Sequence, residues 1–154
     1  MKTSSAIHNF PLTITEGHLD TFGHVNNARY LEIYEDARWE LITANGYGLK
    51  EVHERKIGPI ILSVNLLFKH ELKNREKITV TTQCLDYGGK IFKIEQKMIR
   101  ASGEEASAAT FTCGLFDLKA RKLIEMTPEW NRAVGVERPF ILTKMPFASC
   151  LRHC

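Results

Sequence analysis

Apolar and polar residues alternate with two different periods along the chain, and the change of period divides it into elements. Four segments have a period of two and are rich in Ile, Val, Thr and Phe, which is typical of β-strands: residues 59–70, 77–86, 90–100 and 105–118. A shorter alternation over residues 6–16 predicts one more strand near the start. Hairpin signals at residues 87–89 and 101–104 separate the last three segments, so we expect an antiparallel meander.

The period changes to that of a helix between Asn27 and about Ala44. Tyr30, Tyr34, Ala37 and Leu41 recur at the spacing of one apolar helix face. Asn26 or Asn27 is a natural N-cap, and Asn45-Gly46 is a natural stop. Because a single helix covers only one face of a sheet, we expect it to pack lengthwise across the strands.

The last part of the chain has no periodic pattern. Thr127 and Pro128 predict the start of a short helix over residues 128–134. We therefore expect one folded domain over residues 1–136, followed by a tail over residues 137–154.

Composition narrows the class of protein. The 154 residues amount to one domain, and a formal net charge of +3 is far from the basic stripe of a nucleic-acid-binding protein. We find no secretory signal and no apolar run long enough to span a membrane, so we expect a cytoplasmic protein. The four cysteines, Cys84, Cys113, Cys150 and Cys154, are then reduced thiols, although the last two could form a bridge.

The loop of residues 18–27 concentrates polar and reactive groups directly before the long helix. The first amides of a helix are unpaired and carry partial positive charge, so they stabilise an oxyanion. A carboxylate such as Asp20, a few residues upstream, could face the same reacting atom, which together suits acyl transfer. Alternatively, Asp20 is only an Asx-turn residue and the asparagines are only helix caps.

Other sites are less well supported by motifs. His18, Asp20 and His24 do not have the spacing of a compact zinc site, and we predict no metal. The chain also lacks a serine-hydrolase elbow, a P-loop and a dinucleotide-binding glycine motif.

The run from His18 to Trp39, HLDTFGHVNNARYLEIYEDARW, resembles the signature of hotdog-fold acyl-CoA thioesterases of the 4-hydroxybenzoyl-CoA thioesterase type. It is most similar to the bacterial long-chain acyl-CoA branch, and the resemblance covers about residues 8–136. It implies an α+β hotdog fold, in which an antiparallel five-stranded sheet wraps around one long central helix.

The resemblance also implies roles for individual residues. The family's catalytic carboxylate corresponds to Asp20, and the amide that binds the thioester carbonyl corresponds to a position near Asn27. Plant relatives with the same fold have D-x-N-x-H here, so Asp20 and His24 match, while Phe22 replaces the middle Asn. A mechanism that needs this Asn side chain is therefore in doubt, whereas one that uses Asp20 is not.

Residues 69–77 contain four basic and two acidic side chains. Glu71 corresponds to a functional Glu of the plant enzymes, or is simply an exposed charge at a strand end. Lys69, Lys73 and Arg75 suit the phosphates of coenzyme A, although a solvated turn would have the same composition. On the helix, Glu35 and Arg38 are spaced to form an ion pair.

We therefore predict an acyl-CoA thioesterase of fatty acid metabolism that hydrolyses an acyl thioester to the free acid and coenzyme A. Asp20 acts as general base or nucleophile, the helix N-terminus near Asn27 holds the oxyanion, and His24 orients groups or assists proton transfer. No cofactor is needed, since coenzyme A is part of the substrate. The resemblance implies a homodimer or homotetramer with the site between two subunits.

Two other functions are compatible with the same residues. A hotdog enoyl-thioester hydratase or dehydratase would use an Asp and His pair, and a non-catalytic protein could bind acyl thioesters without turnover. The sequence leaves open the acyl chain length or an aryl preference, and the choice between coenzyme A and an acyl carrier protein.

Overall fold

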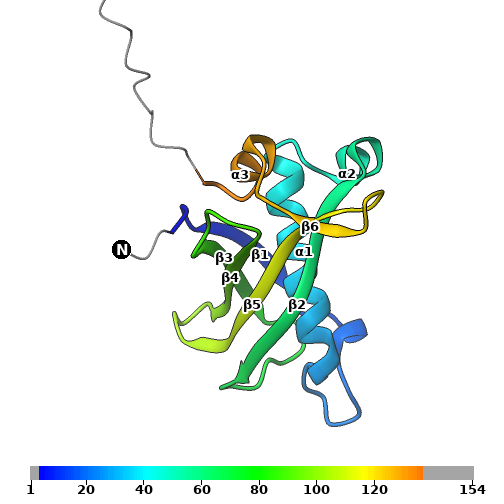
Figure 1. Cartoon of the computed structure of the whole chain (residues 1–154). Coiled ribbons are helices and arrows are strands. Elements are labelled where there is room, and N and C mark those ends of the chain that lie inside the picture. The colour runs from blue at the N-terminus through cyan, green and yellow to red at the C-terminus, as the bar shows by residue number, and fades with distance from the viewer. Residues whose placement is uncertain (1–3, 137–154) are drawn as a thin grey trace, which may run out of the picture.

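A computed structural model describes residues 4–136, which form one antiparallel sheet with α1 on one of its faces (Figure 1). The strands are β1 (His8–Thr13), β2 (Ile57–Phe68), β3 (Lys77–Leu85), β4 (Ile91–Arg100), β5 (Glu105–Asp117) and β6 (Lys122–Ile124). The helices are α1 (Asn27–Ala44), α2 (Leu49–Arg55) and α3 (Pro128–Ala133), with a short 3-10 turn, η1 (Glu16–His18). The strand order is β1-β3-β4-β5-β2, and β6 pairs with β5.

Among residues 4–136 the sheet has six strands, so the prediction of five is wrong. All five predicted strands are present, but β6 has only three residues, too few to show a period. The seven-residue helix α2 escaped the sequence analysis for the same reason. The predicted tail, residues 137–154, lies outside the described residues, as do Cys150 and Cys154.

The predicted boundaries of the long helix are confirmed. The Asn26 side chain accepts a hydrogen bond from the backbone N–H of Ala28, which caps α1 at its first turn. The helix ends before Asn45-Gly46, where Gly46 takes a positive φ of 82°. The short helix α3 also begins as predicted, because the Thr127 side chain accepts from the Trp130 amide.

Buried polar side chains join α1 to the sheet. The Tyr34 hydroxyl lies 2.8 Å from Ser107 Oγ. Gln96 Nε2 donates to the backbone carbonyl of Tyr34 at 3.0 Å and to Thr82 Oγ1 at 2.9 Å. Because buried polar groups are costly unless they are paired, this network fixes how the helix sits on the strands.

The predicted ion pair between Glu35 and Arg38 does not form. Arg38 Nη1 instead donates to Gln96 Oε1 at 2.8 Å, and the guanidinium lies 4.2 Å from the ring centroid of Phe111. Burial lowers the pKa of this guanidinium below its ordinary value. Glu35 accepts a hydrogen bond from Trp39 Nε1 at 3.4 Å, so both charged groups have partners other than each other.

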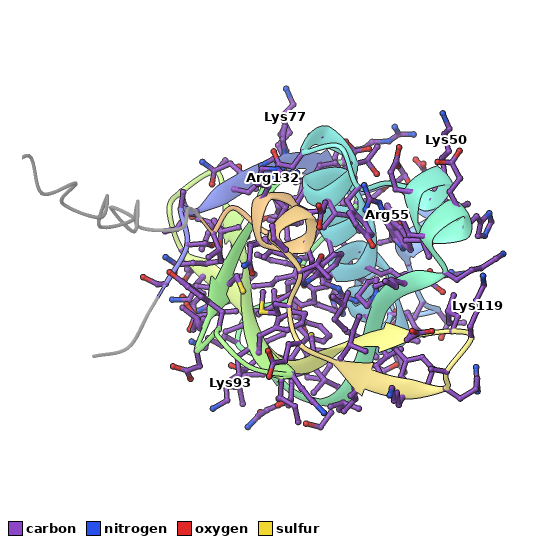
Figure 2. All side chains as sticks on the ribbon, turned by 45° about the horizontal axis from the view of Figure 1, so that its top comes forward. Lys50, Arg55, Lys77, Lys93, Lys119 and Arg132 are labelled. Carbon is purple, nitrogen blue, oxygen red and sulfur yellow. The ribbon has the colours of Figure 1, made fainter. Side chains whose placement is uncertain are left out.

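Basic side chains are spread around the molecule. Figure 2 shows Lys50, Lys77, Lys93 and Lys119 projecting from different sides of the view. Within residues 4–136, no helix is both long and apolar enough to cross a membrane.

Candidate active site

A cleft of about 490 Å³ opens where α1 begins and β2 ends. It is lined by Asp20, His24, Val25, Asn27, Tyr30, Phe68, Lys69, His70 and Glu71. Residues from two segments about fifty positions apart therefore meet at the N-terminus of the long helix.

The Asp20 carboxylate is held by the backbone of its own loop. Oδ1 accepts from the amides of Phe22 at 2.9 Å and His24 at 3.4 Å, and the Asp20 amide donates to the His24 carbonyl at 2.9 Å. Gly23 adopts a φ of 81°, which closes this tight turn and is unfavourable for other residues. Asp20 is thus an Asx-turn residue, and the turn holds the carboxylate at the cleft.

Only one of the two carboxylate oxygens of Asp20 is engaged. Within residues 4–136, Oδ2 accepts no hydrogen bond, while Oδ1 accepts two. Phe22 contributes its amide alone, since its side chain is 84% exposed and does not line the cleft. The substitution of Asn by Phe22 therefore leaves the turn intact.

His24 faces a second carboxylate across the cleft. Its Nε2 lies 3.0 Å from Glu71 Oε2. The two segments are joined beside this pair by the Val25 amide, which donates to the Leu72 carbonyl at 3.0 Å, and by a bridge between His24 and Lys73. Glu71 therefore has a specific partner in the cleft as well as being a partly exposed charge.

The helix start supplies a free donor. The Ala28 amide is used by the Asn26 cap, and the Arg29 amide donates to the Asn26 carbonyl. Within the described part of the chain, the Asn27 amide has no hydrogen-bond acceptor, and Asn27 lines the cleft. An unpaired N–H at a helix N-terminus is suited to bind a carbonyl oxygen that gains negative charge.

Comparison with known proteins identifies the family of the chain. The model of one family, the thioesterase-like superfamily, matches residues 14–134, a span that includes the whole cleft. The chain belongs to this superfamily.

Two similar proteins are named as thioesterases. The chain is 29% identical over 113 residues to the long-chain acyl-CoA thioesterase FadM of Escherichia coli, covering 73% of this chain and 85% of the relative. A crystal structure of YbaW, a probable thioesterase from Escherichia coli, is 25% identical with a TM-score of 0.73, covering 83% of this chain and 96% of that one.

A third comparison shows similarity of fold. The protein SAV2348 from Staphylococcus aureus, solved in complex with CoA, has a TM-score of 0.78 at 19% identity, covering 84% of this chain and 82% of that one. The fold is thus hotdog-like, and the resemblance that led to the prediction of a thioester hydrolase is confirmed.

In this superfamily member, an aromatic pair forms the wall of the cleft on the β2 side. The rings of Tyr30 and Phe68 meet edge to face, with centroids 5.0 Å apart and an interplanar angle of 88°. Burial raises the pKa of the Tyr30 hydroxyl, and the nearby charges of Glu71 and Glu76 raise it further. Tyr30 is therefore neutral at physiological pH, and it was predicted only as a core residue.

The three basic residues predicted to bind phosphate lie in different surroundings. Lys69 lines the cleft and pairs with Glu105. Arg75 Nη2 lies 2.7 Å from Glu16 Oε2, outside the cleft. Hydrogen bonds from the backbone, from the Asn74 side chain and from Arg75 lower the pKa of Glu16 to about 2. Within residues 4–136, the Lys73 ammonium forms no ion pair, and Lys73 adjoins the cleft through its bridge to His24.

His18, the first residue of the loop that contains Asp20 and His24, has a local structural role. Its Nδ1 accepts from the Thr15 amide at 3.0 Å, which closes η1, and His18 does not line the cleft. Among the described residues, no group of three or more histidine, cysteine or acidic side chains is placed to hold a metal ion.

Proposed function

We propose that this protein is an acyl-CoA thioesterase that hydrolyses an acyl thioester to the free acid and coenzyme A. The single observation that carries the proposal is the placement of the Asp20 carboxylate, the His24–Glu71 pair and the free Asn27 amide around one cleft. The FadM relative supports coenzyme A as the carrier and a long acyl chain as the substrate.

Asp20 is the group that starts the reaction. Two backbone amides hold its Oδ1, which leaves Oδ2 free to face the thioester carbon. As a general base, Asp20 takes a proton from water while the water oxygen attacks the carbonyl carbon. As a nucleophile, Oδ2 itself attacks and displaces the thiolate, and water then cleaves the mixed anhydride. Both routes form a C–O bond, break the C–S bond and consume one water.

These two routes differ in where the oxygen of water enters. A single turnover in oxygen-18 water labels only the free acid if Asp20 is the general base. If Asp20 is the nucleophile and water attacks the aspartyl carbonyl of the mixed anhydride, the label enters the Asp20 carboxylate. Oxygen-18 in the Asp20 peptide, detected by mass spectrometry, therefore identifies Asp20 as the nucleophile.

The helix start holds the oxyanion. The Asn27 amide lies at the positive end of an 18-residue helix and donates to no other group among residues 4–136. A carbonyl oxygen bound there gains negative charge in the tetrahedral intermediate, so the amide stabilises the transition state more than the substrate.

The His24–Glu71 pair assists the departing thiolate. The Glu71 carboxylate 3.0 Å from Nε2 orients the imidazole of His24 at the mouth of the cleft. In this position His24 can deliver a proton to the leaving sulfur. A thiolate is already a good leaving group, so this contribution is smaller than that of Asp20.

Coenzyme A phosphates bind at the mouth of the same cleft. Lys73 is the candidate with an uncompensated charge, whereas Lys69 and Arg75 already pair with carboxylates. An approaching phosphate gains most from Lys73, because the charges of the other two are partly neutralised.

The edge strand β2 offers a surface on which a second copy of the chain can pair. Among the described residues, strand β2 is an edge of the sheet that pairs with β5 alone, and it exposes apolar side chains such as Leu62 and Leu67. A long apolar edge strand is a template for pairing with another strand. We propose that β2 pairs with β2 of a second subunit, which gives a homodimer or a dimer of dimers with the cleft beside the interface.

Purified protein incubated with hexadecanoyl-CoA tests the function by release of free thiol. Release of coenzyme A together with hexadecanoic acid supports the thioesterase. Conversion of hexadecenoyl-CoA to the hydroxyacyl-CoA without thiol release identifies a hydratase, and stoichiometric binding without turnover identifies a binding protein. Either of the last two results overturns the proposal.

A further inference from the structure

Strand β2 carries a stripe of apolar side chains on the face of the sheet that α1 covers. In the register with β5, Phe68 lies opposite Ser107, Leu66 opposite Ala109, Val64 opposite Phe111, Ile61 opposite Cys113 and Pro59 opposite Leu115. All five partners on β5 are buried. Residues directly opposite in a sheet point to the same side, so the five β2 side chains also face α1.

A bulge keeps this stripe continuous. The pairing shifts between Ile61 and Ser63, so Leu62 is an extra residue with no partner on β5. Without the bulge, strict alternation from Val64 would turn Ile61 and Pro59 to the opposite face of the sheet. The bulge therefore makes one apolar track out of the two halves of β2.

This track is not covered by the helix. The backbone of α1 lies nearest β3 and β1, toward the other edge of the sheet. As a result, Val64 remains 40% exposed and Ile61 44% exposed, although both face the core side. An apolar track that the fold leaves open is a surface that an apolar ligand can cover.

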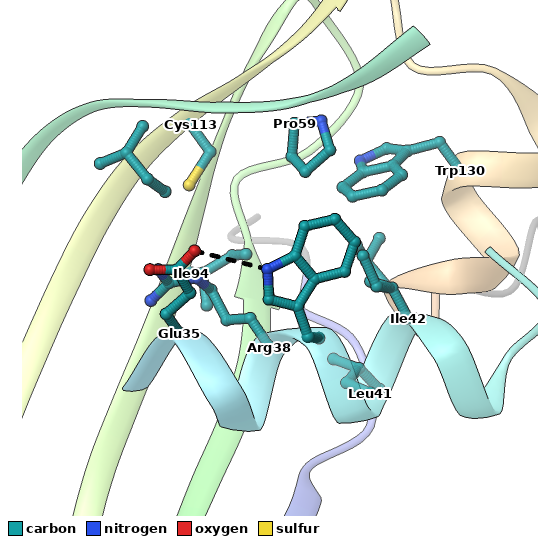
Figure 3. Close-up of a pocket in the computed structure, with 11 residues that line it drawn as sticks. Glu35, Arg38, Leu41, Ile42, Pro59, Ile94, Cys113 and Trp130 are labelled. Carbon is teal, nitrogen blue, oxygen red and sulfur yellow. Dashed lines mark hydrogen bonds between the residues drawn. The ribbon is translucent and has the colours of Figure 1, made fainter. Parts of the chain in front are cut away.

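The track ends in a partly open, largely apolar cavity beside the C-terminal half of α1 (Figure 3). The cavity measures about 100 Å³ and is lined by Glu35, Arg38, Trp39, Leu41, Ile42, Pro59, Ile61, Ile94, Cys113, Trp130 and Val134. Figure 3 shows Pro59 and Cys113 on the side of the strands, Leu41 and Ile42 on α1, and Trp130 at one end.

The charged residues in the wall are already hydrogen-bonded within the protein. Glu35 accepts from Trp39, the interaction drawn as a dashed line in Figure 3, and Arg38 donates to Gln96. Trp130 is 1% exposed and packs against Tyr47, with centroids 5.3 Å apart. The cavity thus offers apolar contact and a rigid end wall.

We propose that this cavity binds the methyl end of the acyl chain whose thioester lies at Asp20, and that Trp39 and Trp130 set the longest chain accepted. This inference rests on the proposed function. From Asn27 to Trp39 the helix rises roughly 18 Å at about 1.5 Å per residue. An extended chain covers roughly 1.2 Å per bond, so an acyl group of about 14 to 16 carbon atoms spans this length. A cavity of this size holds roughly the last four carbons, since about 150 Å³ holds a benzene molecule.

The chain contains two tryptophans in total, and both line this cavity. Tryptophan fluorescence is therefore a direct probe of its occupant. We expect hexadecanoic acid brominated at the methyl end to quench most of the emission on binding, and the acid brominated beside the carboxyl group to quench it weakly. Equal quenching by both acids, stronger quenching by the second, or no binding of either overturns the inference.

A matched pair of substitutions tests chain length independently. Ile61 on β2 lines the cavity, whereas Leu49, an exposed apolar residue at the start of α2, does not. We expect Ile61→Phe to fill the cavity and lower kcat/KM for hexadecanoyl-CoA by about tenfold or more, with little change for octanoyl-CoA. Leu49→Phe should leave both values unchanged.

The outcomes separate this inference from the proposed function. If the acid brominated at its methyl end quenches the fluorescence but no thioester is hydrolysed, the proposed enzyme function is wrong and the cavity is still a fatty-acid site. If Ile61→Phe hydrolyses thioesters with an unchanged preference for chain length, or loses activity equally for both substrates, the proposed role of the cavity is wrong. The proposed enzyme function then still holds.

Discussion

Two parts of the same face of the sheet differ in what covers them. On β4, Phe92, Gln96 and Met98 face α1 and are fully buried. On β2, Val64 and Phe68 face the same side and are 40% and 55% exposed. Since both strands present mainly apolar side chains to this face, the difference comes from the position of α1, which lies toward β3 and β1.

This difference in coverage separates side chains that stabilise the fold from side chains that are available for binding. The covered part holds the core and the polar network around Gln96, so its side chains contribute to folding. The uncovered part leads from the Asp20 cleft to the cavity at Trp130, so its side chains remain available to substrate and to a second subunit. Substitutions in the first part should lower stability, and those in the second should lower activity.

The largest stability effect is expected from Phe92→Ala. Truncation of a fully buried Phe leaves a cavity and should cost about 3–5 kcal/mol of unfolding free energy. Phe68→Ala, its counterpart on β2, should cost less than about 1 kcal/mol and should raise KM for long-chain substrates. Urea unfolding and steady-state kinetics measure both effects. Equal losses of stability in the two variants would contradict the distinction between the covered and the uncovered part of the sheet.

Gln96→Ala should cause the second largest loss of unfolding free energy. It leaves the partly buried Arg38 guanidinium without its acceptor and removes the extra hydrogen bond to the Tyr34 carbonyl, at a cost of about 2–3 kcal/mol. Asn65→Ala on exposed β2 is the control and should change the free energy of unfolding by less than about 0.5 kcal/mol. A stable Gln96→Ala protein would show that the network does not hold α1.

Burial of two thiols predicts a moderate loss of stability in alkali. The pKa values of Cys84 and Cys113 are raised to about 12, from 9.0, mainly because burial disfavours the thiolate. Above pH 9 only the unfolded chain loses these protons, so stability is full below pH 9 and falls as the pH rises toward 12. Each thiol should contribute up to about 1.4 kcal/mol per pH unit in that window.

The double variant Cys84→Ala with Cys113→Ala isolates this effect. Its free energy of unfolding, followed from pH 8 to 10.5 by urea titration, should decline less steeply than that of the natural chain. Identical slopes would show that the thiols do not contribute.

The smallest expected effect lies at the mouth of the cleft. Lys73→Ala should raise KM for an acyl-CoA about three- to fivefold at low ionic strength, and less in high salt. Arg75→Ala should change KM less, because Glu16 already neutralises that charge. A larger effect of Arg75→Ala would reverse this assignment.

The sequence predicted the local parts of this molecule well. Asn26 and Gly46 mark the ends of α1 through local hydrogen bonding and backbone freedom, which the sequence displays directly. The alternation in β3 and β4 was equally clear, since one face of each strand is buried. The proximity of Asp20, His24 and Asn27 followed from their spacing before one helix.

Features that depend on packing between distant segments were not predictable in this way. The approach of Glu71 to His24 requires the β2–β3 connection to fold back on the loop before α1. Arg38 was expected to pair within its helix, but Gln96 on β4 offers a buried acceptor. The bulge at Leu62 is hidden within a nearly continuous apolar run, so the track to the cavity appears only in the structure.

Thioester hydrolysis by Asp20→Asn tests the central claim most directly, with Asp36→Asn on the exposed side of α1 as the matched control. Asn keeps the Oδ1 acceptor of the turn and removes the negative charge, so the melting temperature should stay unchanged. We predict that kcat for hexadecanoyl-CoA falls by about 10²–10⁴-fold in Asp20→Asn and stays at the natural value in Asp36→Asn. A folded Asp20→Asn protein with undiminished kcat would contradict the account.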